Sequence, residues 1–168
     1  NEFSSSYSSY TRTVSNIYNA YGTATDANTD GQGHGTHCAA TIAGTAVGVS
    51  PAANIYGMKV LSDSGSGATS GIVAAMDQVL NRVQNPGTYG SNRAVVSMSL
   101  GGGCDTTYCS QDTMVIAANE LSDYGVIVSV AAGNDYSNGC YGSPGAAVKA
   151  INVAASDSSD VMSTFSNY

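Results

Sequence analysis

The segment DGQGHGTHCAATIAG, residues 30–44, contains both histidines of the chain, His34 and His37, and Cys38 follows directly after the second. Imidazole binds metals, and it also transfers protons near neutral pH because its ordinary pKa is about 6.5. Three interpretations are therefore open: a metal centre of His34, His37 and Cys38, a catalytic base with a neighbour, or ordinary packing. Zinc is disfavoured because positions 37 and 38 point in different directions on a helix and no fourth ligand is evident.

The composition bounds the class of protein. The chain has 168 residues, 42% of them hydrophobic and 10% charged, with a net charge of −7. One domain with a real core is expected at this length. A nucleic acid would be repelled, since there is no basic cluster to offset the negative charge. No apolar run approaches the roughly 18 residues of a membrane span, so neither nucleic acid nor membrane is expected as a partner.

The four cysteines are Cys38, Cys104, Cys109 and Cys140. Cys104 and Cys109 bracket a short polar loop, where a local disulfide is favoured over two free thiols. Closing so short a loop is worth about 2 kcal/mol. A disulfide implies an oxidising compartment, so we expect an extracellular protein.

Apolar periodicity and glycine-rich breaks predict the order of elements along the chain. Residues 1–33 are interpreted as loop with a short strand. Helices are expected at residues 34–44, 69–84 and 111–124, and strands at 54–61, 94–100, 126–132 and 150–156. The strands are continuous apolar runs, which is typical of a parallel sheet covered by helices on both faces. Glycine-rich loops follow three of the strands, so we expect an extended cleft for a peptide at that edge.

The histidine segment resembles the histidine motif of the subtilisin-like serine proteases, peptidase family S8. The similarity continues, in the family's order, through NIYGMKVLSDSGSG, VVSMSLGGG, VSVAAGND and SSDVMSTFSNY. The HGTHC form is similar to the proteinase K branch. The resemblance implies a three-layer α/β fold with a mostly parallel central sheet, here truncated at both ends. It also implies that residues 1–168 form a single, incomplete peptidase domain, with a loop-rich segment 1–33 and an α/β core 34–168.

The resemblance assigns roles to particular residues. His34 corresponds to the catalytic base and His37 to a structural residue. Asn134 corresponds to the donor that stabilises the oxyanion. The walls of the pocket for the residue before the scissile bond correspond to Ser99, Leu100 and Gly101 on one side and Ala131, Ala132 and Gly133 on the other. Gly65, Ser66 and Gly67 resemble the segment that pairs with the substrate backbone. Because the walls are small, the pocket should accept large apolar or aromatic side chains.

The family's orienting aspartate and its nucleophilic serine are not found within residues 1–168. The aspartate belongs upstream of Asn1, and Asp26 and Asp30 are rejected as substitutes because they lie in the loop just before His34. The serine belongs after FSNY. We therefore expect this chain alone to be inactive and only marginally stable, as a partial sequence or a nicked product associated with the remaining pieces of its catalytic domain.

The resemblance implies further properties. Cys38 is similar to a free cysteine beside the catalytic histidine, and Cys140 to half of a disulfide whose partner lies beyond Tyr168. The chemistry requires no cofactor. Structural calcium is common in the family, and residues 148–150 resemble a carbonyl-supplying site, but its aspartate would lie past Tyr168 and no calcium site is assigned. Expected partners are polypeptide substrates and a propeptide, and the protein is expected to be a monomer. The alternatives are a cysteine nucleophile at Cys38, a non-catalytic binding or regulatory module, and an α/β domain of unknown role.

Overall fold

The structure is a computed structural model, and it describes residues 2–8, 10–22, 29–89, 93–105, 107–137 and 142–168. The chain forms two compact units, Asn1–Ala75 and Met76–Tyr168, and each is described by itself. In the described residues, no helix is both long enough and apolar enough to span a bilayer.

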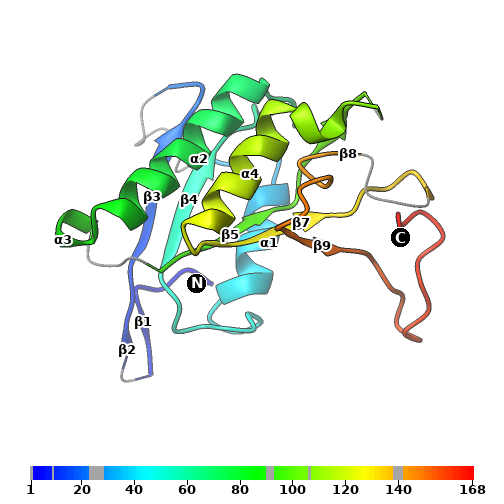
Figure 1. Cartoon of the computed structure of the whole chain (residues 1–168). Coiled ribbons are helices and arrows are strands. Elements are labelled where there is room, and N and C mark those ends of the chain that lie inside the picture. The colour runs from blue at the N-terminus through cyan, green and yellow to red at the C-terminus, as the bar shows by residue number, and fades with distance from the viewer. Residues whose placement is uncertain (1, 9, 23–28, 90–92, 106, 138–141) are drawn as a thin grey trace. The chain divides into compact units, whose positions relative to one another are not determined.

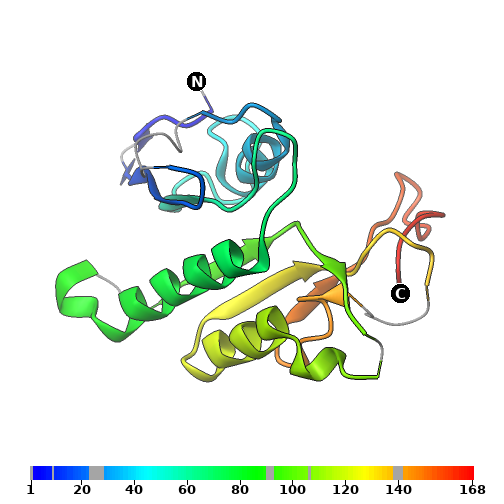
Figure 2. The ribbon, with the colours of Figure 1, turned by 90° about the horizontal axis from the view of Figure 1, so that it is seen from above.

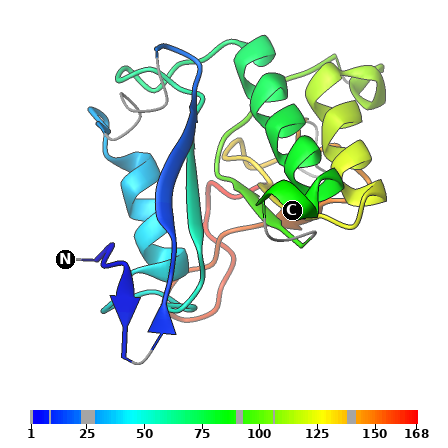
Figure 3. The ribbon, with the colours of Figure 1, turned by 90° about the vertical axis from the view of Figure 1, so that its left-hand side faces the viewer.

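In its described residues, the first unit contains two pairs of strands and one complete helix. Strands β1 (Ser6–Tyr7) and β2 (Tyr10–Thr11) form a short antiparallel pair, and β3 (Val14–Asn19) pairs in parallel with β4 (Ile55–Lys59). Helix α1 (His34–Ala43) lies beside the β3–β4 pair (Figure 3). The prediction for residues 1–33 was loop with a short strand, and it did not locate β3 or its pairing with β4, because the sequence of β3 shows no alternation of apolar and polar residues.

The C-terminal end of α1 is held by a buried arginine. Arg12 is 3% exposed, and its guanidinium donates to the carbonyl oxygens of Ala43, Ser4 and Glu2. Ala43 is the last residue of the helix, where the last carbonyls have no partner within the helix and the helix dipole is negative. Arg12 therefore ties the N-terminal segment to the helix that begins at His34.

Helix α2 (Thr69–Gln84) agrees with the predicted boundaries and runs from the first unit into the second. Three residues of its predicted inward face, Ile72, Met76 and Val83, are buried, and Val79 and Leu80 are half-buried. The short helix α3 (Pro86–Tyr89) follows.

The second unit is built on a parallel sheet in the order β5–β7–β9 (Figure 1), with strands Val95–Met98, Ile127–Ala131 and Ile151–Val153. Helix α4 (Thr113–Asp123) and the second half of α2 cover one face of this sheet (Figure 2). The residues of α4 that were predicted to face inward are all buried, and they are Met114, Val115, Ala118 and Leu121. The predicted α/β class with a mostly parallel sheet is confirmed.

The other face of the β5–β7–β9 sheet carries exposed apolar side chains. Val95 pairs with Ile127 across the sheet, and the exposed fractions of these two residues are 69% and 53%. On β9, Ile151 and Val153 are 57% and 53% exposed. Residues paired in register lie on the same face, so these four form one apolar surface.

A second, short sheet follows β5. Strand β6 (Gly102–Gly103) pairs antiparallel with β8 (Gly142–Ser143). Next in the chain, Cys104 and Cys109 form the predicted disulfide, with their Cα atoms 5.3 Å apart. Cys140 lies outside the described residues, so its predicted pairing is untested.

Candidate active site

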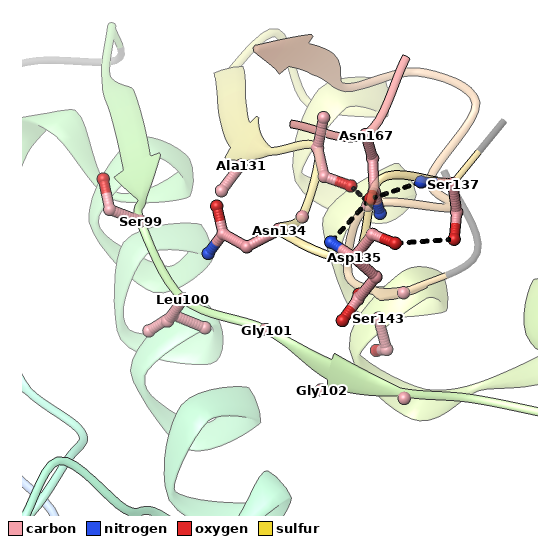
Figure 4. A pocket seen from close by; sticks show the side chains of 15 residues that line it. Ser99, Leu100, Gly101, Gly102, Ala131, Asn134, Asp135, Ser137, Ser143 and Asn167 are labelled. Carbon is pink, nitrogen blue, oxygen red and sulfur yellow. Dashed lines mark hydrogen bonds between the residues drawn. The ribbon is translucent and has the colours of Figure 1, made fainter. Parts of the chain in front are cut away.

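A pocket of about 390 Å³ lies in the second unit, where β5 and β7 end (Figure 4). Its volume falls in the usual range of ligand pockets, about 300–1,000 Å³. The lining residues come from the segments after β5 and β7, from β8 and its following turn, and from the C-terminal segment. They are Ser99, Leu100, Gly101, Gly102, Gly103, Ala131, Ala132, Gly133, Asn134, Asp135, Ser137, Gly142, Ser143, Gly145 and Asn167.

Both predicted walls line this one pocket. The segment 99–101 follows β5 and the segment 131–133 ends β7, and these two strands are parallel neighbours. The carboxyl ends of parallel strands meet at one edge of a sheet, which explains why the segments 99–101 and 131–133 converge although they are far apart in the chain. The side chains on both walls are small except for Leu100, so the pocket stays open.

The side chain of Asn134 is free to bind a ligand. The residue is exposed, and in the described part of the chain its amide makes no hydrogen bond. It points away from Asn167 toward the segment that follows β5 (Figure 4). An unpaired amide donor at the rim of a pocket can donate to an oxygen of a bound molecule.

Asn167 holds the backbone on both sides of Asn134. Its Oδ1 accepts hydrogen bonds from the N–H groups of Asp135 and Ser137, at 2.8 and 3.1 Å, and its Nδ2 donates to the carbonyl oxygen of Ala132, at 3.0 Å. Its own N–H donates to the carbonyl oxygen of Gly133, at 3.1 Å. The residue is 3% exposed, so these bonds are shielded from water.

Ser143 links another wall of the pocket to the start of α4. The Asp112 carboxylate caps this helix by accepting from the N–H of Met114, at 2.9 Å, and it also accepts from the hydroxyl of Ser143. Ser143 is 1% exposed. Asp135 is the single residue with a charged side chain among the described lining residues, so an acidic ligand group would be repelled.

His34 belongs to the first unit, as the first residue of α1. The carboxylate of Asp30 organises this helix start. Its Oδ1 accepts from the N–H groups of Gln32 and Gly33, and its Oδ2 accepts from the N–H and the hydroxyl of Thr36. The hydrogen bond from the Thr36 hydroxyl and that from the Gly33 N–H hold the pKa of Asp30 well below its usual range.

The His34 ring is exposed, and its Nε2 lies 3.8 Å from the sulfur of Cys38, one helical turn further on. Cys38 is a free, half-buried cysteine. His37 is also exposed. In the part of the chain that the structure describes, no group of three or more His, Cys, Asp or Glu side chains gathers as metal ligands. The geometry of these residues therefore gives the metal-centre interpretation no support.

The loop after β4 contains Gly65, Ser66 and Gly67, which are all exposed. The carbonyl oxygen of Ser66 accepts from the Ser62 N–H, at 2.8 Å, and from the Tyr21 hydroxyl, at 2.9 Å. Among the described residues no strand pairs with this segment, so its predicted pairing with a substrate backbone remains a prediction.

At the end of β4, Lys59 forms an ion pair with Asp63 and donates to the carbonyl oxygen of Thr29, at 3.0 Å. The hydrogen bond from Lys59 lowers the pKa of Asp63. The Gly31 N–H donates to Asp63, at 3.3 Å. These contacts fasten the segment before α1 to the end of β4.

Eight lining residues were not predicted from the sequence. They are Gly102, Gly103, Asp135, Ser137, Gly142, Ser143, Gly145 and Asn167. Gly102, Gly103 and Asp135 continue motifs that were already assigned, so a longer reading of those motifs would have found them. Ser143 and Asn167 reach the pocket through contacts that span 30 residues or more, and no local pattern indicates them.

The chain matches the model of the Subtilase family, Peptidase_S8, over residues 2–168. It is 48% identical over 139 residues to the alkaline serine protease ver112 of Corniculantispora psalliotae, which covers 83% of this chain and 34% of that protein. It is 46% identical over 142 residues to a cuticle-degrading protease of Metarhizium anisopliae, covering 84% of this chain and 34% of that protein.

A similar fold is found in the crystal structure of a cold adapted subtilisin-like serine proteinase. The TM-score is 0.63 and the sequences are 37% identical, over 76% of this chain and 42% of that one. The chain spans about a third of the length of the curated relatives named above.

Proposed function

Because the chain belongs to the subtilase family, we propose that the protein containing it is a serine endopeptidase that acts on polypeptides. One observation carries the proposal: a pocket with small walls opens at the ends of two parallel strands, with the unpaired amide of Asn134 at its rim. A substrate side chain would fill the pocket, and the carbonyl that follows it would lie within reach of this amide.

His34 would act as the base in this reaction. Its ring takes the proton of a serine hydroxyl as the serine oxygen bonds to the substrate carbonyl carbon, and the carbonyl π electrons move to the oxygen. Asn134 donates a hydrogen bond to that oxyanion. The C–N bond then breaks, His34 protonates the leaving amine, and water hydrolyses the acyl-enzyme through the same steps. The family's serine lies in a Gly-Thr-Ser-Met-Ala-like segment, which residues 1–168 do not contain. We propose that this serine comes from outside this range, as does the orienting aspartate.

The pocket would favour apolar and aromatic side chains before the scissile bond. Gly101, Ala131 and Ala132 leave room for a large side chain, and the carboxylate of Asp135 disfavours an acidic one. A panel of tetrapeptide anilides that differ in this residue tests the preference. Hydrolysis should be fastest for Phe, Tyr or Leu and slowest for Glu, and a preference for Glu would contradict it.

An extracellular location is part of the proposal, supported by the Cys104–Cys109 disulfide. Calcium usually takes six to eight oxygen ligands, and residues 148–150 would contribute carbonyl oxygens alone. No catalytic step is assigned to calcium, and a structural calcium ion, a propeptide and a monomeric state stay predictions from the family.

The two histidines provide a matched pair of variants for the test. Both are exposed and lie one turn apart on α1. In the intact protein, His34→Ala should lower kcat on the order of 10⁶-fold, the magnitude known for the equivalent histidine of subtilisin, a member of the same family. His37→Ala should keep kcat within about threefold.

The other interpretations predict different results. A non-catalytic binding module would show no hydrolysis in the intact wild-type protein. A cysteine nucleophile would make Cys38→Ala inactive. We expect Cys38→Ala to stay active and a serine-directed sulfonyl fluoride to abolish activity. The polypeptide 1–168 alone should show no hydrolysis.

A further inference from the structure

We propose that Asn167 is a positioning residue for the oxyanion donor, acting through the backbone on both sides of Asn134. This inference rests on the proposed function, because it concerns how the donor of that site is held. It assigns a task in the reaction to a buried side chain whose hydrogen bonds go to the backbone of the segment that carries Asn134.

Asn134 has no side-chain partner of its own in the described part of the chain. The position of its amide is therefore set by its backbone, which lies in an irregular segment after β7. Gly133 has a φ of +111°, in the left-handed region that side chains rarely adopt. A segment without a regular hydrogen-bond ladder needs other partners to stay in one conformation.

Asn167 supplies those partners. Its amide bridges Ala132 on one side of Asn134 to Asp135 and Ser137 on the other, and its backbone N–H binds Gly133. Two neighbouring hydrogen bonds join the same segments. The Tyr136 N–H donates to the carbonyl oxygen of Phe165, and the Tyr168 N–H donates to the carbonyl oxygen of Ser137. The segment 165–168 therefore runs alongside the segment that carries the donor.

The chemistry of this position is specific to asparagine. One oxygen must accept two N–H groups, and a donor on the same planar group must meet a carbonyl. Aspartate offers the acceptor but no donor for Ala132, and alanine offers neither. A β-carbon built on Gly133 would lie 2.3 Å from the Asn167 Nδ2, so the two residues are fitted closely to each other.

A hydrogen-bond donor stabilises the transition state more when it is held in position before the reaction. Deleting such a donor lowers kcat by about 10²–10³-fold in subtilisin, so this is the expected effect of Asn134→Ala. Loosening the donor without deleting it should cost less. We expect Asn167→Ala to lower kcat by about 10- to 100-fold with KM within about threefold, and Asn167→Asp to fall between Asn167→Ala and wild type.

The test is a double-mutant cycle in the intact protein, measured as kcat and KM on one anilide substrate. If Asn167 acts through Asn134, then Asn167→Ala should change kcat by no more than about threefold once Asn134 is already alanine. The control is Asn119→Ala. Asn119 is a half-buried asparagine in α4 whose side chain accepts from the Lys149 N–H, at 3.0 Å, and it does not line the pocket. The Asn119→Ala variant should have a lower melting temperature and an unchanged kcat.

Three results would overturn the inference. The first is a kcat of Asn167→Ala within about threefold of wild type, and the second is an equal loss of kcat with and without Asn134. The third is failure of both Asn167→Ala and Asn167→Asp to fold, since Asn167 would then be a requirement of folding. An inactive wild type, or Asn134→Ala with wild-type kcat, would instead refute the proposed function.

Discussion

Asp30→Asn separates two roles that an aspartate just before a catalytic histidine can have. As the orienting acid of a triad, its loss would favour the wrong tautomer of the histidine and lower kcat by about 10⁴-fold. As the residue that organises the start of α1, its loss would mainly lower stability. The structure favours the second role, because both carboxylate oxygens are occupied by groups of Gln32, Gly33 and Thr36.

The magnitude follows from the four hydrogen bonds that the carboxylate accepts. Asparagine keeps one acceptor oxygen and places an NH₂ group where the second carboxylate oxygen was. The two hydrogen bonds that the second oxygen accepted are therefore lost. At about 0.5–1.5 kcal/mol for each bond, and with water able to reach this exposed site, the loss of unfolding free energy should be about 1–2 kcal/mol. The value of kcat should fall by less than about tenfold.

The assay measures kcat and the free energy of unfolding in urea for the intact protein. A serine-directed inhibitor is added during unfolding so that the protein does not digest itself. The control is Asp105→Asn, because Asp105 makes a similar turn contact in the second unit, accepting from the Thr107 N–H at 2.9 Å. It should leave kcat unchanged. A loss of kcat near 10⁴-fold for Asp30→Asn, with unchanged stability, would refute the reasoning.

The same variant has a predicted pH dependence. The pKa of Asp30 is lower in the folded protein than its value of about 3.9 in an unfolded chain. Its contribution to stability is therefore fully present above about pH 4 and is lost as the pH falls through the folded pKa. The difference in unfolding free energy between wild type and Asp30→Asn should shrink as the pH is lowered from 4 to 2, and a difference constant from pH 7 to pH 2 would contradict this sign.

Three further outcomes are expected. Arg12→Lys should lower the unfolding free energy by about 2–3 kcal/mol in urea, because an ammonium group cannot reach all the carbonyls that the guanidinium binds at the end of α1. Replacing both Cys104 and Cys109 by serine should lower it by about 2 kcal/mol, and a reduced wild type should match this variant. The polypeptide 1–168 alone should bind a hydrophobic dye through the exposed face of β5, β7 and β9, and a cooperative melt at high temperature without dye binding would contradict the predicted marginal stability.

The helices and the central strands could be predicted because their patterns are local. Helix α2 has apolar residues at helical spacing from Ile72 to Val83, and the structure gives it the predicted boundaries, Thr69–Gln84. Strand β3 could not be predicted in the same way. Its sequence, VSNIYN, mixes polar and aromatic residues without alternation, and its ladder depends on the partner strand β4.

The residues of the candidate site also differ in how far the local sequence predicts them. The residues of its two walls belong to contiguous motifs that end strands, and parallel pairing of β5 with β7 is enough to bring them together. The remaining walls depend on the β6–β8 pairing and on the C-terminal segment. Such contacts join residues far apart in the chain, so they cannot be predicted from the local sequence.

The two side chains assigned to the chemistry are held in contrasting ways. The start of the helix that carries His34 is organised by Asp30, four residues earlier, and an acidic residue before a helix start can be recognised in a sequence. The backbone that carries Asn134 is organised by Asn167, whose side-chain partners lie 30 to 35 residues earlier in the chain. A related sequence could therefore keep the motif around Asn134 and still lose the donor's position through a change at 167. Presence of the motif is a necessary condition for the oxyanion donor, and the partner that fixes it has to be found in the fold.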